Sequence, residues 1–414
     1  MLTSLRLVNF KNFADETLKL GPFTVIVGAN ASGKSNIRDA FRFLHGIGRG
    51  YTLAEIMGGK LGPGGYVEWD GIRGAPNEIV RFGQSDSPGS GEFTLSVGMR
   101  RSEESTVFSA TVGFNPDDPD GFRWLSDDTL VNGQPAMGSV SFASQWHRIS
   151  ESPRPYLTRN LGDESPYDDV RLHIRSVLEN MRFLDPSPAQ MREPSIPGAT
   201  TLGDHGQNLP TVLESICADA DRKQTLLSWF EELTPMDVAG FEFPRDPSGR
   251  VHLQILERNG RKVSAYSASD GTLRFLGILA ALMNENAGGI YFFEEIDTGI
   301  HPNRLWLLLD LIERQTAKGK MQVITTTHNP ALLDWIRDET FEHTSVIYRD
   351  EYWSDSVIRP IADLYHLREL RKSRGLGRLF TSGWLESAMK ASEGDFDTDH
   401  LDDDDEDDWG IAEE

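Results

Sequence analysis

Residues 28–35, GANASGKS, constrain the fold of this chain more than any other segment. They fit the pattern Gly-x-x-x-x-Gly-Lys-Ser/Thr, directly after the short apolar run at 23–27 and directly before a helical stretch at 36–44. The glycines allow the backbone to curl so that successive N–H groups point inward, and the helix N-terminus adds partial positive charge. This context predicts a strand, a phosphate-binding loop (P-loop) and a helix, in preference to a glycine-rich turn with a chance lysine.

The P-loop predicts a binding site for ATP and Mg²⁺. Lys34 should bridge the β- and γ-phosphates, and the hydroxyl of Ser35 should be a ligand of Mg²⁺. The residues expected to bind the nucleotide are Gly28, Ala29, Asn30, Ala31, Ser32, Gly33, Lys34, Ser35 and Asn36.

A second apolar run, residues 290–293, ends in the two carboxylates of Glu294 and Glu295. Successive side chains on a strand face opposite ways, but at a frayed strand end both can reach the phosphate site. We predict that Glu294 holds Mg²⁺ and its water shell, and that Glu295 is the general base that polarises the attacking water. Two solvated acids at a strand terminus are the alternative interpretation.

Two further segments have both a structural and a functional interpretation. A β-run at 322–327 is followed by His328, which can donate to a γ-phosphate and sense its loss, although a lone histidine is more often structural. Residues 267–272, SASDGT, open an apolar helix. By itself this segment is typical of a helix cap, in which Ser269 or Asp270 satisfies free N–H groups.

The order of these motifs resembles the ABC-type ATPase heads of the RecF/SMC/OLD class. The shared features are the P-loop, Ser-Asp-Gly-Thr at a helix start, a strand ending in Glu-Glu, His-Pro, a late Thr-His and the opening LRLVNFKNF. The chain also resembles stand-alone bacterial predicted ATPases of the AAA family that are associated with phage defence and DNA repair. That resemblance rests on DPSPAQMREPS (185–195), LGDHGQNLPTVL (202–213) and LGRLFTSGW (376–384).

The resemblance implies that ATP lies between two heads of a homodimer or higher homo-oligomer. Ser269 and Gly271 of one head would contact the γ-phosphate on the P-loop of the other, while Asp297, His301 and Pro302 match a segment at the dimer interface. It also implies a partner effector, nuclease-like and encoded nearby. Glu294 stands where Asp is commoner in this class, and the glutamine that senses Mg²⁺ is left open among three residues. These are Gln84, Gln134 and Gln145.

We therefore predict an α/β fold, an ABC-type P-loop ATPase head with an antiparallel β-subdomain, a helical insertion and a disordered acidic C-terminal tail. β-rich runs between 65 and 114, including YVEW and EIVRF, favour the antiparallel sheet, and residues 168–183 have one apolar helical face. Strands that alternate with helices after residue 271 favour a mainly parallel sheet. The predicted parts are an N-terminal ATPase lobe (1–150), a mainly helical insertion (151–245), a C-terminal ATPase lobe (246–360), a basic helical segment (361–392) and the acidic tail (393–414).

Composition limits where the protein can be located and which partners it can bind directly. Nowhere do about 18 uncharged apolar residues run together as a membrane span requires, and the single cysteine, Cys217, excludes an intramolecular disulfide and fits a cytoplasmic protein. The formal charge is −23, but residues 393–414 contain 13 acidic and no Lys or Arg residues, which leaves 51 acidic against 41 basic residues elsewhere. Any DNA contact would therefore need a local basic patch or a partner. Arg368, Arg371, Lys372, Arg374 and Arg378 form either such a docking site or a solvated helix, and the tail is either solvated or a mimic of nucleic acid.

Three functions remain under consideration. The first is an ATPase that dimerises around ATP and drives or gates an effector in anti-phage defence or DNA repair. The second is a nucleotide-dependent scaffold with little turnover. The third, a transporter nucleotide-binding subunit, is disfavoured by the NFKNF opening, the large insertion and the EEIDTGIHP strand end.

Overall fold

The computed structural model describes most of the chain. The described residues are 1–81, 91–115, 121–136, 140–141, 157, 168–234, 236–283, 289–349, 355–364, 367–368, 371 and 376–377. Gln84, Gln145, Lys372, Arg374, Arg378 and the acidic tail lie outside them. Gln134 is described and lies on the exposed two-residue strand β9.

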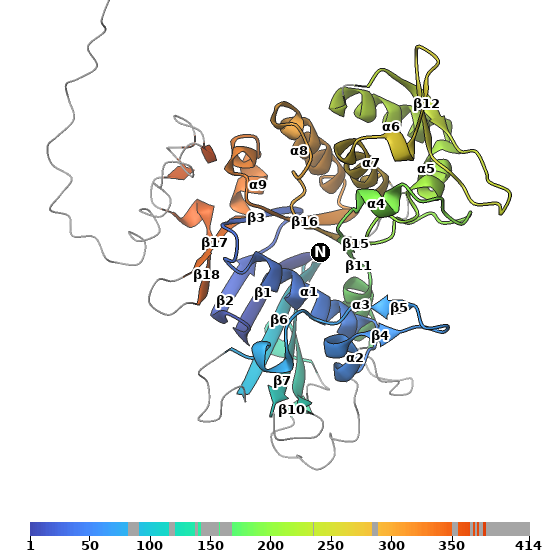
Figure 1. Ribbon diagram of the computed structural model, residues 1–414. Coiled ribbons are helices and arrows are strands. Elements are labelled where there is room, and N and C mark those ends of the chain that lie inside the picture. The colour runs from blue at the N-terminus through green and yellow to red at the C-terminus, as the bar shows by residue number, and fades with distance from the viewer. Residues whose placement is uncertain are drawn as a thin grey trace, which may run out of the picture.

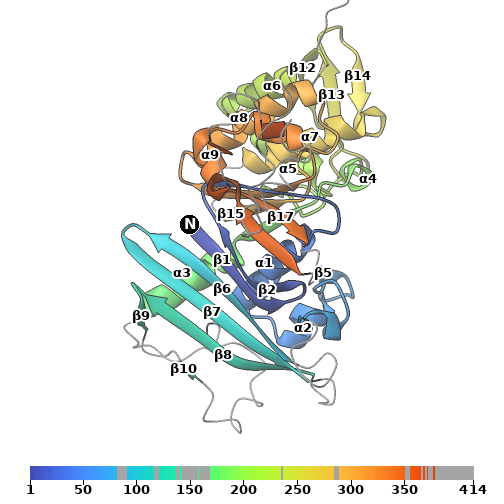
Figure 2. The same ribbon diagram turned by 90° about the vertical axis from the view of Figure 1, so that its left-hand side faces the viewer.

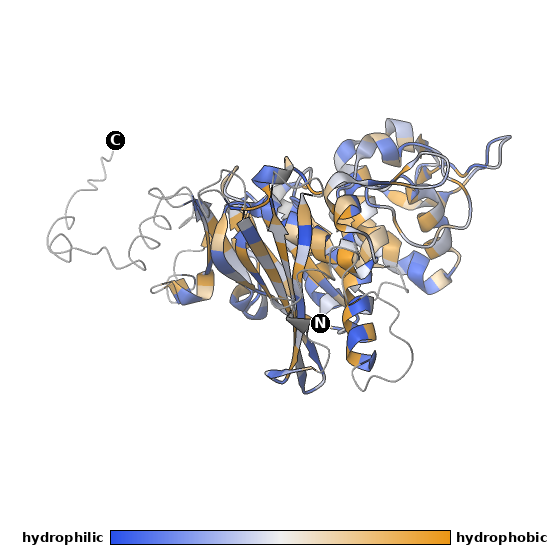
Figure 3. Ribbon diagram, turned by 90° about the horizontal axis from the view of Figure 1, so that it is seen from below, coloured by the Kyte–Doolittle hydropathy of each residue, from blue (hydrophilic) through white to orange (hydrophobic). Residues whose placement is uncertain are grey.

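A seven-stranded antiparallel sheet forms one layer (Figures 1 and 2). Its strands are β1 (Leu2–Phe10), β2 (Phe13–Lys19), β6 (Gly91–Arg101), β7 (Glu104–Phe114), β8 (Phe122–Val131), β9 (Gln134–Pro135) and β10 (Val140–Ser141), in the order β10-β8-β7-β6-β1-β2 with β9 beside β8. Along β7, buried residues alternate with partly exposed ones, because one face of the sheet packs on the core. The same alternation of hydrophobic and hydrophilic residues is visible along the strands in Figure 3.

Two of the β-runs expected in this sheet do not join it. The YVEW run becomes β5 (Val67–Trp69), which pairs with β4 (Lys60–Leu61) in a separate two-stranded sheet. The described residues of the EIVRF run, 78–81, form no strand: Pro76–Glu78 is the short 3-10 helix η1, and Val80 makes an isolated bridge to Phe10. The N-terminal hairpin β1–β2 takes their place, because β1 pairs with β6.

The second layer is a six-stranded sheet that is parallel except at one edge. Its strands are β11 (Met181–Leu184), β15 (Gly289–Phe293), β16 (Met321–Thr327), β3 (Phe23–Gly28), β17 (Thr344–Arg349) and β18 (Ser356–Pro360), in that order, with only β18 antiparallel. All seven residues of β16 are buried, as expected for a central strand that is covered on both faces. The carboxyl ends of β3, β15 and β16 meet at one edge, where ligands of parallel sheets bind.

The helix expected over 168–183 is shorter than the sequence predicts. Helix α3 (Asp168–Glu179) ends before Met181, and residues 181–184 form β11, which pairs with β15. The apolar face of the periodic segment continues into Met181 and Phe183, but these side chains fill the core from a strand. The boundaries at 150/151 and 245/246 stay predictions.

Helix α1 (Lys34–Gly48) is buried between the two sheets. The ring centroid of Phe43 lies 5.4 Å from that of Phe93 in the antiparallel sheet. The ring centroid of Phe41 lies 5.8 Å from that of Phe292 in the parallel sheet. The short helix α2 (Leu53–Gly58) packs on α1, whereas α9 (Asp338–Glu342) lies on the opposite side of the parallel sheet (Figure 1), and the 3-10 helices η5 (Pro330–Asp334) and η6 (Ile361–Asp363) pack against α8 and α9 respectively. The P-loop helix therefore links both layers of the core.

The other helices lie across the parallel sheet from α1 (Figure 1). They are α4 (Pro188–Met191), α5 (Leu209–Cys217), α6 (Ala220–Leu233), α7 (Asp270–Leu282) and α8 (Pro302–Thr316), accompanied by η4 (Ala265–Ser267) and the three-stranded sheet of β12 (Val238–Glu242), β13 (Gln254–Glu257) and β14 (Lys262–Ser264). The turn between β13 and β14 has Gly260 at φ 85°, as the Asn-Gly dipeptide predicts for its second position. Among the described residues, no helix has both the length and the apolar character that crossing a membrane would require.

Gln322 on β16 ties the N-terminal strand to the parallel sheet. Its side-chain oxygen accepts from the N–H of Leu2 at 2.9 Å, while its amide nitrogen donates to the carbonyls of Leu2 at 2.9 Å and Gly21 at 2.8 Å. The residue is 3% exposed. Since a buried polar group left without a partner is costly, this amide fixes how the two layers meet.

We expect Gln322→Ala to lower the free energy of unfolding by about 2–4 kcal/mol, because buried backbone groups of Leu2 and Gly21 would lose their partners. Urea unfolding followed by circular dichroism measures the change. Gln224→Ala, on the exposed face of α6, is the matched control and should change stability little. Equal urea midpoints for Gln322→Ala and Gln224→Ala would contradict the role of Gln322 in joining the two layers.

Candidate functional site

The P-loop has the strand, turn and helix that the sequence predicts. It joins β3 to α1, with Ala31 at φ 64° and Gly33 at φ 110°, and no side chain caps α1. A Cβ atom at Gly33 would lie 2.7 Å from Oγ of Ser356 and 2.8 Å from Nδ2 of Asn12. The hydroxyl of Ser32 is buried and has no hydrogen-bond partner among the described residues. A concave backbone, an uncapped helix N-terminus and an unpaired hydroxyl fit a phosphate.

Lys34 lies inside this loop. It is 8% exposed, and its Nζ donates to the carbonyls of Gly28 at 2.6 Å and Ala29 at 2.7 Å. The pKa of Lys34 is lowered, because the effect of burial outweighs the opposing effect of the nearby Glu295 carboxylate. The ammonium group thus lies within reach of both the loop and the acidic strand end.

Polar side chains from the β1–β2 turn support the P-loop from behind, and the sequence did not single them out. Oδ1 of Asn12 accepts from Asn36 at 2.7 Å, and its Nδ2 donates to Ser356, whose hydroxyl donates to the carbonyl of Ser32. In the same turn, Lys11 forms a buried ion pair with Asp39 of α1 at 2.5 Å. The opening NFKN was the available signal, but its contacts depend on tertiary structure.

Glu295 and His328 come together at the carboxyl ends of β15 and β16. The distance from Nδ1 of His328 to Oε1 of Glu295 is 3.3 Å, and the hydroxyl of Thr298 donates to the other carboxylate oxygen at 3.3 Å. Glu295 has φ 48°, a left-handed conformation that costs a non-glycine residue about 1–3 kcal/mol. Its N–H donates to the hydroxyl of Thr326 at 3.2 Å. Strain at this carboxylate is typical of a functional position.

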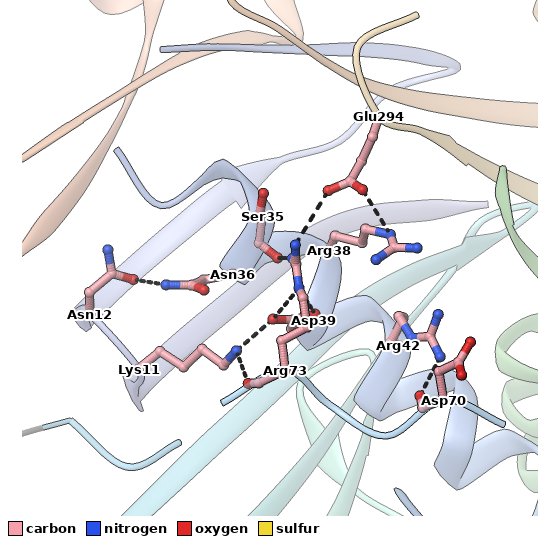
Figure 4. Close-up of polar contacts among 10 residues, drawn as sticks. All are labelled: Lys11, Asn12, Ser35, Asn36, Arg38, Asp39, Arg42, Asp70, Arg73 and Glu294. Carbon is pink, nitrogen blue, oxygen red and sulfur yellow. Dashed lines mark hydrogen bonds and ion pairs between the residues drawn. The ribbon is translucent and has the colours of Figure 1, made fainter. Parts of the chain in front are cut away.

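Glu294 faces two arginines (Figure 4). Its Oε2 lies 3.5 Å from Nε of Arg38 on α1, and its Oε1 lies 4.0 Å from Nη1 of Arg73. Arg73 also donates to the carbonyl of Ser35 at 2.5 Å and pairs with Asp39 at 3.2 Å. The two residues predicted to hold Mg²⁺ are therefore bridged by one guanidinium group. A hydroxyl and a carboxylate are suitable oxygen ligands for this ion, which takes its other ligands from phosphates and water.

The predicted signature segment lies at an exposed helix tip. The hydroxyl of Ser269 accepts from the N–H of Thr272 at 3.1 Å and caps α7, so the capping interpretation of this serine is confirmed. Arg192 anchors the tip by donating to the carbonyl of Ala268 at 3.0 Å and to Asp270 at 2.6 Å. Within the described residues, Ser269 makes no hydrogen bond to the P-loop of its own chain.

Gly271 packs this helix tip against the turn that follows Glu294 and Glu295. A Cβ atom on Gly271 would collide with the carbonyl oxygen of Gly299, which itself has φ 81°. Asp297, in the same turn, is 8% exposed, and its Oδ1 has no partner among the described residues. The signature segment and the turn that follows Glu295 thus pack as one unit.

Comparisons with known proteins agree with this arrangement. A family model described as "AAA domain, putative AbiEii toxin, Type IV TA system" matches residues 23–106 and 218–334, a region that contains the P-loop, the start of α7, both strand-end glutamates and His328. No curated protein sequence matches the chain.

Two solved structures are similar over most of their length. One is the SmcHead bound to the C-winged helix domain of ScpA, with 16% identity, a TM-score of 0.51, and coverage of 86% of this chain and 96% of that one. The other is the Smc head domain with an extended coiled coil bound to the C-terminal domain of ScpA, derived from Pyrococcus furiosus, with 14% identity, a TM-score of 0.50, and coverage of 90% and 99%. At these identities the similarity shows a shared fold.

We expect Gly271→Ala to lower the free energy of unfolding by about 1–3 kcal/mol, because its new methyl group meets rigid backbone. Gly277→Ala, in the same helix, is the control: its methyl group would meet the flexible end of Met191 and should be tolerated. Thermal unfolding of both variants measures the difference. If Gly271→Ala were as stable as Gly277→Ala, the close packing on Gly299 would be refuted.

Proposed function

We propose that the chain is a RecF/SMC-like ABC-type ATPase head that binds ATP with Mg²⁺ at residues 28–36 and hydrolyses it. The observation that carries the proposal is the convergence of Glu295 and His328 at the edge of the sheet from which the P-loop starts. A base, a histidine and an anion-binding loop in one place suit the attack of water on a phosphate.

The residues of the site have separate roles. Lys34 exchanges the carbonyls of Gly28 and Ala29 for β- and γ-phosphate oxygens. Ser35 and Glu294 would hold Mg²⁺, which would supply positive charge to offset that of the phosphates. Glu295 accepts a proton from the attacking water, and His328 donates to the γ-phosphate.

We expect Glu295→Gln to reduce the steady-state rate of ATP hydrolysis by about 10²–10⁴-fold, because the amide cannot accept the proton. Affinity for ATP should stay near the wild-type value, since the P-loop is unchanged. Phosphate release and equilibrium nucleotide binding measure the two quantities. A wild-type protein without turnover would instead favour the alternative function, a nucleotide-dependent scaffold that holds a partner.

We further propose that each site is completed by a second copy of the chain. The support is the exposed tip of α7, where Ser269 and Gly271 combine a hydroxyl with a helix N-terminus that can bind an anion. In a two-fold pair each α7 tip would reach the γ-phosphate on the partner's P-loop. Asp297 and the turn that contains His301 and Pro302 would lie at the same interface.

Mixing two inactive variants tests this arrangement. Lys34→Ala removes phosphate binding but keeps the α7 tip, whereas Ser269→Arg blocks the tip but keeps the P-loop. Random pairing makes half of the dimers mixed, each with one intact composite site, so about a quarter of the wild-type activity should return. Activity that stays at the level of the separate variants would contradict sites shared between copies.

We propose that the ATP-bound pair drives or gates a partner effector, which is nuclease-like and encoded nearby. The pair and its effector would act in the cytoplasm, in anti-phage defence or DNA repair. The supporting observations are the toxin–antitoxin wording of the matching family model and the two similar heads solved with ScpA domains bound. A direct DNA contact belongs to the same proposal. The genes beside this one are the quickest check, because a membrane permease there would favour a transporter subunit instead.

A further inference from the structure

We propose that Arg38 and Arg73 are built-in counter-ions of Glu294 that compete with Mg²⁺ for its carboxylate. The inference rests on the proposed function and concerns how that site is regulated. Arg38 and Arg73 would hold the acidic strand end against the P-loop helix and release it only when Mg²⁺ takes the carboxylate. The affinity of the site for Mg²⁺ is then set by these arginines as well as by its ligands.

The geometry divides the carboxylate between two cations. Arg38 approaches one oxygen at 3.5 Å and Arg73 approaches the other at 4.0 Å, so each oxygen of Glu294 has its own guanidinium group. Glu294 is 22% exposed and Arg38 is 12% exposed, which limits screening of that pair by water, whereas Arg73 is 47% exposed. Both distances exceed those of a charge-assisted hydrogen bond. The pairs are therefore attractive yet loose enough for a divalent ion to replace.

Arg73 is anchored so that it cannot simply drift away. Its Nη2 donates to the carbonyl of Ser35 at 2.5 Å, and its Nε contacts both oxygens of Asp39 at 3.2 and 3.3 Å. Figure 4 shows its guanidinium group between Ser35 and Glu294. Asp39 does not depend on Arg73 for neutralisation, because Lys11 already pairs with it at 2.5 Å. Since Lys11 already balances the charge of Asp39, the positive charge of Arg73 can attract Glu294.

The length of the glutamate side chain matters to this arrangement. A carboxylate with one methylene fewer at residue 294 would sit farther from both guanidinium groups, whose anchors are fixed on α1 and at Ser35. Glutamate at this position therefore couples the metal carboxylate to the arginines in a way that aspartate would not.

Arg73→Gln tests the competition. Binding of a fluorescent ATP analogue to the full chain is titrated with Mg²⁺, and the Mg²⁺ concentration for half of the maximal effect is compared with that of the wild type. We expect this concentration to fall by roughly tenfold, the factor that corresponds to about 1.4 kcal/mol. Arg38 forms an ion pair with Glu294, so Arg38→Gln should lower this Mg²⁺ concentration as well.

Two controls separate competition from other effects. Arg258→Gln also removes a guanidinium group with two acidic neighbours, Glu231 and Asp237, but lies on the β12–β14 side of the molecule and should leave the Mg²⁺ dependence unchanged. In a Glu294→Gln background, Arg73→Gln should lose its effect, because no carboxylate remains to compete for. A purely structural role of Arg73 would persist in that background.

The outcomes are distinct. An unchanged or raised half-effect concentration in both folded arginine variants would overturn the inference while leaving the proposed function intact. A wild-type chain that binds no nucleotide at any Mg²⁺ concentration would overturn both. The predicted fall, lost in the Glu294→Gln background, would support the arginines as competitors of Mg²⁺.

Discussion

Parallel pairing of β3, β16 and β15 is the constraint on which the site depends. Thr327 of β16 lies opposite Val27 of β3, and Phe293 of β15 lies opposite Thr325, so the chain leaves the sheet at one edge three times. Each exit delivers a different group: the anion-binding loop, the two carboxylates and the histidine. Because neighbouring parallel strands end together, the pairing of these three strands brings the three groups to one edge.

Helix α1 connects this edge to the rest of the molecule. Its aromatic residues pack on both sheets, and its polar face receives Lys11 and Asn12 from the β1–β2 turn and Arg73 from the segment after β5. The P-loop is thus supported by charges and amides that come from distant parts of the chain. The same network reaches Glu294, the proposed metal ligand, through Arg38 and Arg73.

Local patterns predicted much of the fold, and their failures have physical causes. The helix at 302–316 and the strands around 23–27, 290–293 and 322–326 appear as expected, because burial gives the helix one apolar face and makes the central strands continuously apolar. The helix expected over 168–183 includes residues 181–183, which belong to a strand, since so few apolar positions cannot distinguish the end of a helix from a buried strand. YVEW was assigned to the large sheet, but strand pairing depends on which edges are free, and β1 occupies the edge of β6.

Motifs along the chain specify the chemical groups of the site and their order: a P-loop, a capped helix tip, two strand-end glutamates and a late histidine. The packing of the two sheets and of α1 then selects which of these groups meet. Glu295 contacts His328 because neighbouring parallel strands end side by side, and Glu294 faces Arg38 and Arg73 because α1 and the segment after β5 converge there. Periodicity and motif spacing record contacts along one element, whereas ion pairs between distant segments depend on how whole layers pack.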